Sequence, residues 1–329
     1  MIPWLLTISS PDIPAQERAV GDLCMVWYNT ENLFYPGDDT LSPDDEFTPE
    51  GIYHWTWSRY RDKLTAIAKV IIASGGWDPP GLVAFCEVEN ANVLEELTNH
   101  PILAPYHYLF IHKEGPDHRG LEVACLIREE KFTGIDWEYI PWRSPVKATR
   151  EMMHLTLCCD ADTLDLFLVH LISKYGGPGA TAQLRRIQAE QLVNCMDSVN
   201  AVRVKGLIMA MGDFNDQLSG FSLEPLRNTR IGGDTLLPAD PGGGEGSYKY
   251  RGQWSNIDHV LISRSLHYYL TSVSILRLPQ LLTEDQAYGG IKPGRTYEGY
   301  IYRGGVSDHL PLVAELTLSP PSRSDLHGQ

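Results

Sequence analysis

The fold is set by a pattern that is clearest at residues 207–216, LIMAMGDFND. The apolar run at 207–211 has the length and composition of a strand buried on both faces. The polar turn GDFND follows it directly at 212–216. Glycine, asparagine and aspartate are common in turns, so this stretch alone is compatible with a simple turn. The stretch becomes informative because other apolar runs of the chain also end in polar residues.

Other apolar runs also lead to, or contain, side chains that bind metals or transfer protons. Together with Asp213, these side chains are Asn29, Glu87, His170, Asp258, Asp308 and His309. A single carboxylate at a strand end usually caps a turn or faces solvent, and a single histidine is usually a core residue. Strand ends meet at one rim of a sheet, where enzymes assemble sites from distant parts of the sequence. The joint occurrence of these side chains at several strand ends therefore predicts a functional site that they form together.

Composition sets limits on what the protein is. The chain has 329 residues, of which 43% are hydrophobic and 21% are charged, so disordered and collagen-like architectures are excluded. A net charge of −15 excludes a basic nucleic-acid coat and disfavours tight, salt-driven binding of DNA. The six cysteines are irregularly spaced, which indicates buried thiols rather than a disulfide scaffold or structural zinc. No apolar run is long enough to predict a transmembrane segment.

Periodicity predicts an α/β fold with a large sheet core. Strands are expected at 24–28, 82–86, 121–127, 155–159, 164–171, 207–211, 257–262, 273–276 and 312–318. Amphipathic spacing predicts helices at 57–74 and 181–199, with a weaker one at 91–99. We expect one domain over 1–329, with a core at about 24–318 and peripheral segments at 1–23 and 319–329. Residues 232–246 and the tail are expected to be mobile, and 38–45 to form a solvated loop.

Six motifs occur in a characteristic order along the chain. They are WYNTENLF (27–34), DEFTPEG (45–51), CEVEN (86–90), GDFND (212–216), IDHV (257–260) and SDHLP (307–311). In these motifs the chain resembles the endonuclease/exonuclease/phosphatase superfamily, which has the DNase I-like fold, and its bacterial members in particular. The resemblance implies a four-layer α/β/β/α sandwich, in which two mixed sheets pack face to face with helices outside. It also implies that the site lies at one open end.

The resemblance implies a phosphoesterase that depends on Mg²⁺, with Mn²⁺ as the alternative cation. A phosphate ester resists attack because its anionic oxygens repel a nucleophile, so catalysis needs charge neutralisation and an oriented water. Magnesium prefers oxygen ligands, and Glu87 is the first-choice ligand. Asn29 and Asp308 occupy the positions at which the family completes or supports that metal site.

The same resemblance assigns the catalytic residues. Asp213 matches the residue that orients or deprotonates the attacking water, and Asn215 holds a phosphate oxygen or that water. His309 matches the imidazole that stabilises the phosphorane, and Asp258 orients it and raises its pKa. His170 lies where the family places a histidine or tyrosine that donates to the phosphate or the leaving group.

Substrate contacts are predicted at Arg119 and Lys174. Bacterial family members follow the central histidine with Trp-Pro-Ser-Arg, whereas this chain has LISK at 171–174, which replaces a bidentate guanidinium with a point charge. Glu122 stands where an aspartate is expected. Five further residues could contact substrate, although a surface helix and a packed hairpin are the favoured interpretations: Arg185, Arg186, Tyr248, Tyr250 and Trp254.

Several functions fit this sequence. A phosphodiesterase of the nuclease type comes first, and a phosphomonoesterase or lipid-headgroup phosphodiesterase on the same site stays open. A non-catalytic binding protein of this fold would lack part of the site, and a zinc hydrolase needs clustered ligands that the scattered cysteines do not provide. The expected partner is a phosphate ester, with nucleic acid among the candidates, and no obligate protein partner is indicated. The sequence does not determine the cellular compartment and weakly favours the cytoplasm.

Overall fold

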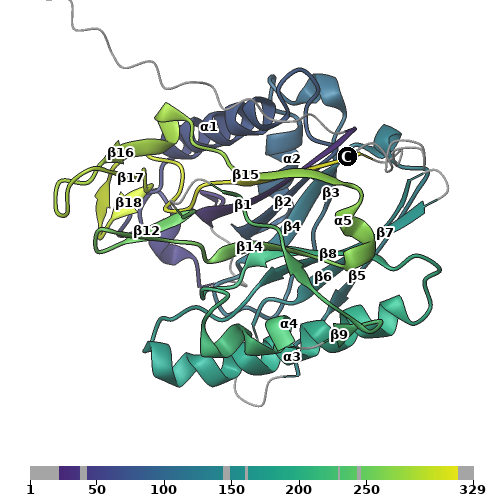
Figure 1. Ribbon diagram of the computed structural model, residues 1–329. Coiled ribbons are helices and arrows are strands. Elements are labelled where there is room, and N and C mark those ends of the chain that lie inside the picture. Colours follow the sequence, from purple (N-terminus) through teal and green to yellow (C-terminus); the bar gives the residue numbers. More distant parts are fainter. Residues whose placement is uncertain are drawn as a thin grey trace, which may run out of the picture.

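The computed structural model describes residues 22–37, 43–143, 149–159, 162–228, 230–242 and 246–317. Two six-stranded mixed sheets pack face to face, and helices cover their outer faces (Figure 1). This arrangement confirms the predicted four-layer sandwich. Residues 1–21, 38–42 and 318–329, on which the expectations about the termini and the acidic loop largely fall, lie outside the described residues.

The first sheet has β1 and β2 at its centre. In spatial order its strands are β15 (Leu270–Ile275), β20 (Leu312–Leu316), β1 (Leu23–Leu33), β2 (Leu82–Val88), β4 (Glu122–Ile127) and β3 (Leu109–Ile111). β1 and β2 run parallel, and the other neighbours are antiparallel. β1 is buried along almost its whole length, as expected for a central strand covered on both faces.

The second sheet has β8 and β7 at its centre. In spatial order its strands are β11 (Leu237–Pro238), β14 (Asp258–Ile262), β8 (Leu207–Asp213), β7 (Asp162–His170), β6 (Met152–Cys159) and β5 (Gly134–Ile140). β7 and β8 are parallel, and the other pairs are antiparallel. β5 was not predicted, because it is an edge strand with half-exposed and exposed residues and therefore lacks an apolar run.

The side chains of β8 divide the hydrophobic core in two. Met209 and Met211 belong to the cluster between the two sheets, whereas Ile208 and Ala210 belong to the cluster beneath α3. Successive side chains of a strand point to opposite faces, so a strand covered on both sides is apolar throughout. This explains the uninterrupted apolar run with which the sequence pattern begins.

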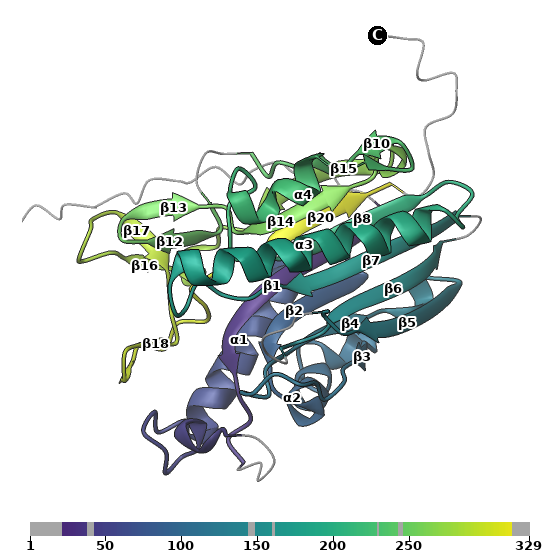
Figure 2. The same cartoon turned by 90° about the horizontal axis from the view of Figure 1, so that it is seen from below.

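Helices cover both outer faces of the sandwich. α1 (Trp57–Gly75) and α2 (Ala91–Thr98) lie over the first sheet, and α3 (Pro178–Asn200) and α4 (Glu224–Asn228) lie over the second (Figures 1 and 2). The three predicted helices are therefore confirmed, with shifted ends. The short helices α4 and α5 (Arg264–His267) were not predicted. None of the described helices has the length and apolar character needed to span a bilayer.

Four small hairpins complete the chain. They are β9 (Arg230–Ile231) with β10 (Asp234–Thr235), β12 (Tyr248–Tyr250) with β13 (Gln253–Ser255), β16 (Leu282–Glu284) with β17 (Ile291–Pro293), and β18 (Tyr297–Glu298) with β19 (Ile301–Tyr302). The last three gather at one end of the sandwich (Figure 1). Part of the stretch 232–246, which was expected to be mobile, forms β10 and β11, while 243–245 lie outside the described residues.

Candidate active site

Neighbouring strands bring three of the predicted residues to the same height in the second sheet. His170 ends β7, Asp213 ends β8 and Asp258 begins β14. The register pairs Asp213 with both neighbours, because β7 runs parallel to β8 and β14 runs antiparallel to it. Asn29 reaches the same place from β1 of the first sheet. The site therefore lies where the two sheets face each other at one end.

Asp213 is at the centre of the site. Its Oδ2 accepts a hydrogen bond from Asn29 Nδ2 at 3.1 Å and lies 3.6 Å from His170 Nε2 and 3.8 Å from His309 Nε2. Its Oδ1 accepts from the backbone N of Asn215 at 2.8 Å. Burial raises the pKa of Asp213 to about 7, although the neighbouring His309 opposes the shift. A carboxylate with this pKa can exchange a proton near neutral pH.

His309 and Asp258 form a buried ion pair. His309 Nδ1 donates to Asp258 Oδ2 at 2.7 Å, and Asp258 also accepts from Ser247 Oγ at 2.6 Å and Trp27 Nε1 at 3.0 Å. Burial alone would raise the pKa of Asp258, but His309 and the hydrogen bonds lower it. Burial alone would lower the pKa of His309, but Asp258 and Asp213 raise it well above its ordinary value. The imidazole is therefore held as a cation, with Nε2 towards Asp213.

His170 has a partner that sequence reasoning missed. Arg150 NH2 lies 3.0 Å from His170 Nε2, and Arg150 NH1 donates to Asp117 Oδ2 at 3.1 Å. A guanidinium group only donates, so Nε2 accepts and the neutral ring carries its proton on Nδ1. Burial and the charge of Arg150 hold the pKa of His170 well below its ordinary value. Arg150 lies in the loop before β6, where no pattern marks it.

A second network of hydrogen bonds and ion pairs lies on the side of the first sheet, and the sequence did not predict it. Glu31 Oε1 accepts from Arg295 Nε at 3.0 Å, and Glu31 Oε2 accepts from the backbone N of Thr296 at 2.8 Å. Arg295 NH2 donates to Asp308 Oδ2 at 2.7 Å. The buried ammonium of Lys63 donates to Thr296 Oγ1 at 2.8 Å. Glu31 stands in the first motif, but Arg295 comes from the hairpin region 276–306, where the sequence gives no pattern.

The oxygen donors at this end of the molecule fit a hard divalent cation. Burial lowers the pKa of Lys63 to about 8, while the charges of Glu31, Glu87 and Asp308 oppose that shift. Glu87 Oε2 accepts from the backbone N of Asn32 at 2.8 Å, and its Oε1 accepts no hydrogen bond from the described residues. Carboxylate and amide oxygens are the ligands that Mg²⁺ and Mn²⁺ prefer.

The described residues contain two compact groups of three potential metal ligands. Cys86, His170 and Asp213 form one, and Asp213, Asp258 and His309 form the other, with the ligand atoms of each group within 4.8 Å of one another. Neither group contains Glu87 or Asp308, so the assignment of Glu87, Asn29 and Asp308 as metal ligands stays a prediction. Burial raises the pKa of the Cys86 thiol well above its ordinary value.

The backbone is strained around these groups. Seven described residues other than glycine have positive φ angles, and four of them lie at the site. Those four are Glu31 (+48°), Asn32 (+53°), Glu87 (+63°) and Asn215 (+52°). Such conformations cost free energy and persist only where the surrounding structure enforces them, often at functional sites. They aim side chains from the ends of β1, β2 and β8 into the same space.

The two predicted substrate contacts lie in different surroundings. Arg119 NH1 donates to Asn32 Oδ1 at 3.4 Å, which places Arg119 next to the carboxylate network. Lys174 is exposed and pairs with Asp216 Oδ1 at 2.8 Å, without contacting the other predicted residues. Both assignments stay predictions. Asn215 is next to Asp213, and its Nδ2 donates to the carbonyl of Leu171 at 3.0 Å.

The five less favoured substrate contacts have structural partners. Arg185 is buried and donates to Ile172 O at 3.1 Å, and Arg186 binds Glu224 at 2.5 Å. Tyr248, Tyr250 and Trp254 belong to the β12–β13 hairpin. The guanidinium of Arg277 covers the ring of Trp254 at 4.3 Å. The interpretation as surface arginines therefore fits Arg186 but not Arg185, which is 1% exposed. The hairpin is packed as expected, and it places the ring of Tyr248 4.9 Å from that of His309.

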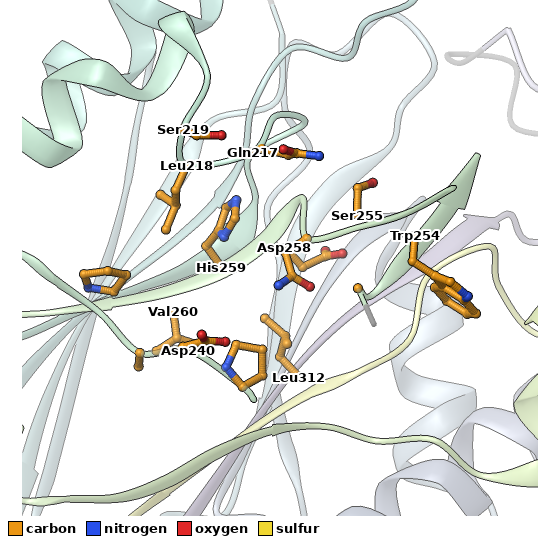
Figure 3. Close-up of a pocket in the computed structure, with 15 residues that line it drawn as sticks. Gln217, Leu218, Ser219, Asp240, Trp254, Ser255, Asp258, His259, Val260 and Leu312 are labelled. Carbon is orange, nitrogen blue, oxygen red and sulfur yellow. The ribbon is translucent and has the colours of Figure 1, made fainter. Parts of the chain in front are cut away.

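A pocket of about 420 Å³ has Asp258 among its lining residues. Figure 3 shows Asp258 and His259 in it, with Gln217 and Leu218 on one side and Leu312 on the other. Asp213 and His309 do not line this pocket. The hydrogen bonds of the Asp258 carboxylate to His309, Ser247 and Trp27 therefore define the catalytic side of β14.

Comparison with known proteins agrees with this geometry. The sequence profile of the Endonuclease/Exonuclease/phosphatase family matches residues 24–317, and no curated protein sequence matches the chain. The chain is similar to sphingomyelinase C from Streptomyces griseocarneus (17% identity, TM-score 0.57, covering 90% of this chain and 99% of that one). It is also similar to the human Nocturnin catalytic domain with bound sulfate anion (16%, 0.56, 90% and 94%) and to truncated Caenorhabditis elegans TDP2 (14%, 0.55, 90% and 97%).

At these identities, the solved structures show a shared fold. The match of the family profile covers nearly the whole described chain. Asn29 contacts Asp213 and His309 contacts Asp258 at the end of the sandwich. The chain belongs to the endonuclease/exonuclease/phosphatase family, and it is a hydrolase that acts on phosphate ester bonds.

Proposed function

We propose that the protein is a divalent-metal-dependent phosphodiesterase that hydrolyses its substrate by in-line attack of an activated water. The supporting observation is the position of Asp213 Oδ2, which lies within 3.8 Å of two imidazoles and accepts a hydrogen bond from Asn29. Burial places the pKa of this carboxylate at about 7. A base, a cation and a neutral hydrogen-bonding ring thus face one small volume, as phosphate ester hydrolysis requires.

Asp213 takes the proton of the attacking water. Two donors, Asn29 Nδ2 and the backbone N of Asn215, fix the orientation of its carboxylate. A base is most effective when its pKa lies near the working pH, and burial brings Asp213 into that range. Asn215 has its Nδ2 bound to Leu171 O, so its Oδ1 is the atom that can hold the water.

His309 stabilises the charge that develops on the phosphate. Asp258 holds its Nδ1 proton, so Nε2–H points towards the space between Asp213 and Asp308. Asp258 and Asp213 raise the pKa of His309 well above its ordinary value, which favours the charged form of this donor. His170 differs, since burial and Arg150 keep it neutral, and its Nε2, which faces Asp213, accepts from Arg150 and adds no charge.

Glu87, with Asn29 and Asp308, would hold Mg²⁺ or Mn²⁺. When bound there, the cation supplies neutralisation of the phosphate oxygens. Arg119 and Arg295 lie beside these carboxylates, through Asn32 and Asp308 respectively.

A single panel of esters tests the proposed function. With millimolar Mg²⁺ or Mn²⁺, we expect hydrolysis of bis(p-nitrophenyl) phosphate to exceed that of p-nitrophenyl phosphate, and EDTA to abolish both. Asp213→Asn should lower kcat by about 10³-fold or more, because the amide cannot take a proton. DNA, RNA, sphingomyelin and phosphoinositides then identify the natural substrate class.

Asp136→Asn is the matched control. It makes the same chemical change at an exposed position of β5, outside the site, and should retain full activity. Faster cleavage of the monoester would favour the phosphatase alternative. Absence of hydrolysis across the whole metal-supplemented panel, with wild-type protein that is folded by circular dichroism, would favour a binding protein. Equal activity of Asp213→Asn and wild type would remove Asp213 from the mechanism.

A further inference from the structure

A crevice of about 490 Å³ lies among the hairpins at the active-site end of the molecule. β16 and β17 and the segment that carries β18 and β19 form its walls, at the left of Figure 1. One of its lining residues, Arg295, also contacts the catalytic network through Glu31 and Asp308. The side chain of Arg295 is 44% exposed. The guanidinium group of Arg295 therefore borders both the active site and the crevice.

The crevice gathers positive charge in a chain that is strongly acidic overall. Lys292, Arg295 and Arg303 line it, together with the carboxylates Glu284 and Glu298. The chain as a whole carries 42 acidic and 27 basic residues. The lining therefore has one more cation than carboxylates, whereas carboxylates outnumber cations in the whole chain.

Glu298 holds two of these cations in place. It pairs with the ammonium of Lys292, and its Oε2 accepts from Arg303 Nε at 3.0 Å. Among the described residues, no side chain or backbone group accepts a hydrogen bond from NH1 or NH2 of Arg303. The outer edge of this guanidinium is therefore free to bind a ligand, and the inner edge is fixed by Glu298.

The backbone around the crevice is fixed as well. Gly305 N donates to Arg295 O at 3.1 Å, and a Cβ atom added to Gly305 would lie 2.0 Å from the carbonyl oxygen of Gly294. The two segments that carry Arg295 and Arg303 thus cross in direct backbone contact, which only glycine allows. The positions of both arginines are preformed rather than induced.

We propose that this crevice is a subsite for a second phosphate group of the same ester whose scissile phosphate lies at Asp213 and His309. The inference rests on the proposed function. The polar lining, in which Leu282 and Ala287 are the apolar side chains, suits a hydrated anion better than an aromatic ring. Arg295 lies between the two phosphate positions, and Arg303 with Lys292 binds the distal one.

Matched substrates test the proposal. The p-nitrophenyl ester of thymidine 5′-phosphate is compared with the same ester carrying a 3′-phosphate. Because the molecule is acidic overall, simple repulsion would weaken binding of the second ester. We expect instead that its KM is lower by about fivefold, and that the variant Arg303→Gln with Lys292→Gln removes this difference while kcat changes less than twofold. For the ester without the 3′-phosphate, the variant should match wild type.

Arg227→Gln is the control for the loss of positive charge. Arg227 lies on α4, which covers the second sheet away from β16, β17 and β18 (Figure 1), and this variant should keep the fivefold preference. Equal KM values for the two esters in wild type, or a preference that survives in the double variant, would overturn the proposal. Circular dichroism confirms folding, and folding should persist because Arg303 is half-exposed.

A binding measurement separates this proposal from the proposed function. Inorganic phosphate is titrated into metal-free protein, and its ³¹P line width is recorded. His309 and the arginines of the active site also attract phosphate, so only the broadening that the double variant loses reports the crevice. We expect broadening with wild type and Arg227→Gln, and about fivefold weaker binding with the double variant. If no ester is hydrolysed, the proposed function fails while this measurement still tests the anion site. Identical broadening in wild type and the double variant would refute that site.

Discussion

Arg150 determines how His170 can act. It is almost completely buried, it lies 3.0 Å from Nε2 of the imidazole, and its other side donates to Asp117. An arginine in this place excludes a protonated histidine, since two cations would face each other without solvent between them. The histidine named in the sequence is therefore one part of a chain of three side chains, and its role depends on the other two.

This chain of contacts predicts that removing Arg150 destabilises the protein strongly, and that a second substitution at Asp117 restores part of the lost stability. Arg150→Met leaves Asp117 as a buried carboxylate without its cation, and we expect the free energy of unfolding to fall by about 3–5 kcal/mol. Adding Asp117→Asn should recover part of that loss, because the buried charge is then gone. Urea unfolding of the two single variants and the double variant measures the coupling. Strictly additive effects would contradict a direct Asp117–Arg150 pair.

Glu122 predicts a pH dependence of stability. It is buried, its Oε1 accepts from Asp117 N at 3.1 Å, and burial raises its pKa from 4.5 to about 7. Between these pH values the folded chain keeps a proton that the unfolded chain has lost. The free energy of unfolding therefore falls as pH rises from about 4.5 to about 7, by at most on the order of 3 kcal/mol from this group.

The variant Glu122→Gln isolates that contribution. Glutamine keeps an acceptor oxygen for the Asp117 backbone but has no proton to lose. Urea unfolding at pH 5 and pH 7 should therefore show a smaller decrease for the variant than for wild type. The decrease that remains is expected from Glu31 and Asp213, whose pKa values burial also raises to about 7. An unchanged decrease in the variant would mean that Glu122 is ionised across this range.

Among the secondary-structure elements, the contact between β7 and β8 positions the catalytic residues. Gly212 faces Val169 in the register, one residue before the pair of Asp213 and His170. A Cβ atom at Gly212 would lie 2.2 Å from the carbonyl oxygen of Val169. The glycine of the GDFND motif is therefore required by close backbone approach between parallel strands, in addition to any role in a turn.

Two glycine substitutions test that explanation. Gly212→Ala should lower the free energy of unfolding by about 1–3 kcal/mol, because the strands must separate. It should also reduce phosphodiester hydrolysis, because Asp213 moves relative to His170. Gly179→Ala is the matched control: it lies near the start of α3 with no heavy atom within 4 Å of the added Cβ, and it should be neutral or stabilising by up to about 1 kcal/mol. Equal stability of the two variants in urea would contradict the close-approach argument.

For the molecule as a whole, the carboxylates of both sheets meet at one end, and a cation is expected to stabilise the fold. At a Mg²⁺ concentration 100 times the Kd, binding to the folded state adds about 2.7 kcal/mol to the free energy of unfolding. We expect Mg²⁺ to raise the Tm of wild type and of Asp136→Asn by the same amount. Glu87→Gln should show a much smaller rise. An equal rise in Glu87→Gln would refute the assignment of Glu87 as a ligand.

The sequence by itself predicted the central buried strands, the three longer helices and a set of candidate site residues. Apolar runs marked the buried strands and pointed to His170, period 3.6 marked α1 and α3, and the six motifs supplied Asp213, Asp258 and His309. These features are local, since burial imposes its period on neighbouring residues along the chain. The edge strand β5 and the short helices α4 and α5 were not predicted, because half-exposed strands and helices of four or five residues leave no such pattern.

Only the tertiary structure decided which side chains touch. Asn29 and Asp213 are 184 positions apart, and Trp27 and Asp258 are 231 apart, yet each pair shares a hydrogen bond. The ion pair of Arg295 with Glu31 also joins distant residues, which are 264 positions apart. Arg295 lies in an irregular hairpin region with no sequence period. Strand register and the crossing of two glycine-containing segments bring such residues together, and neither is encoded in any local stretch of the chain.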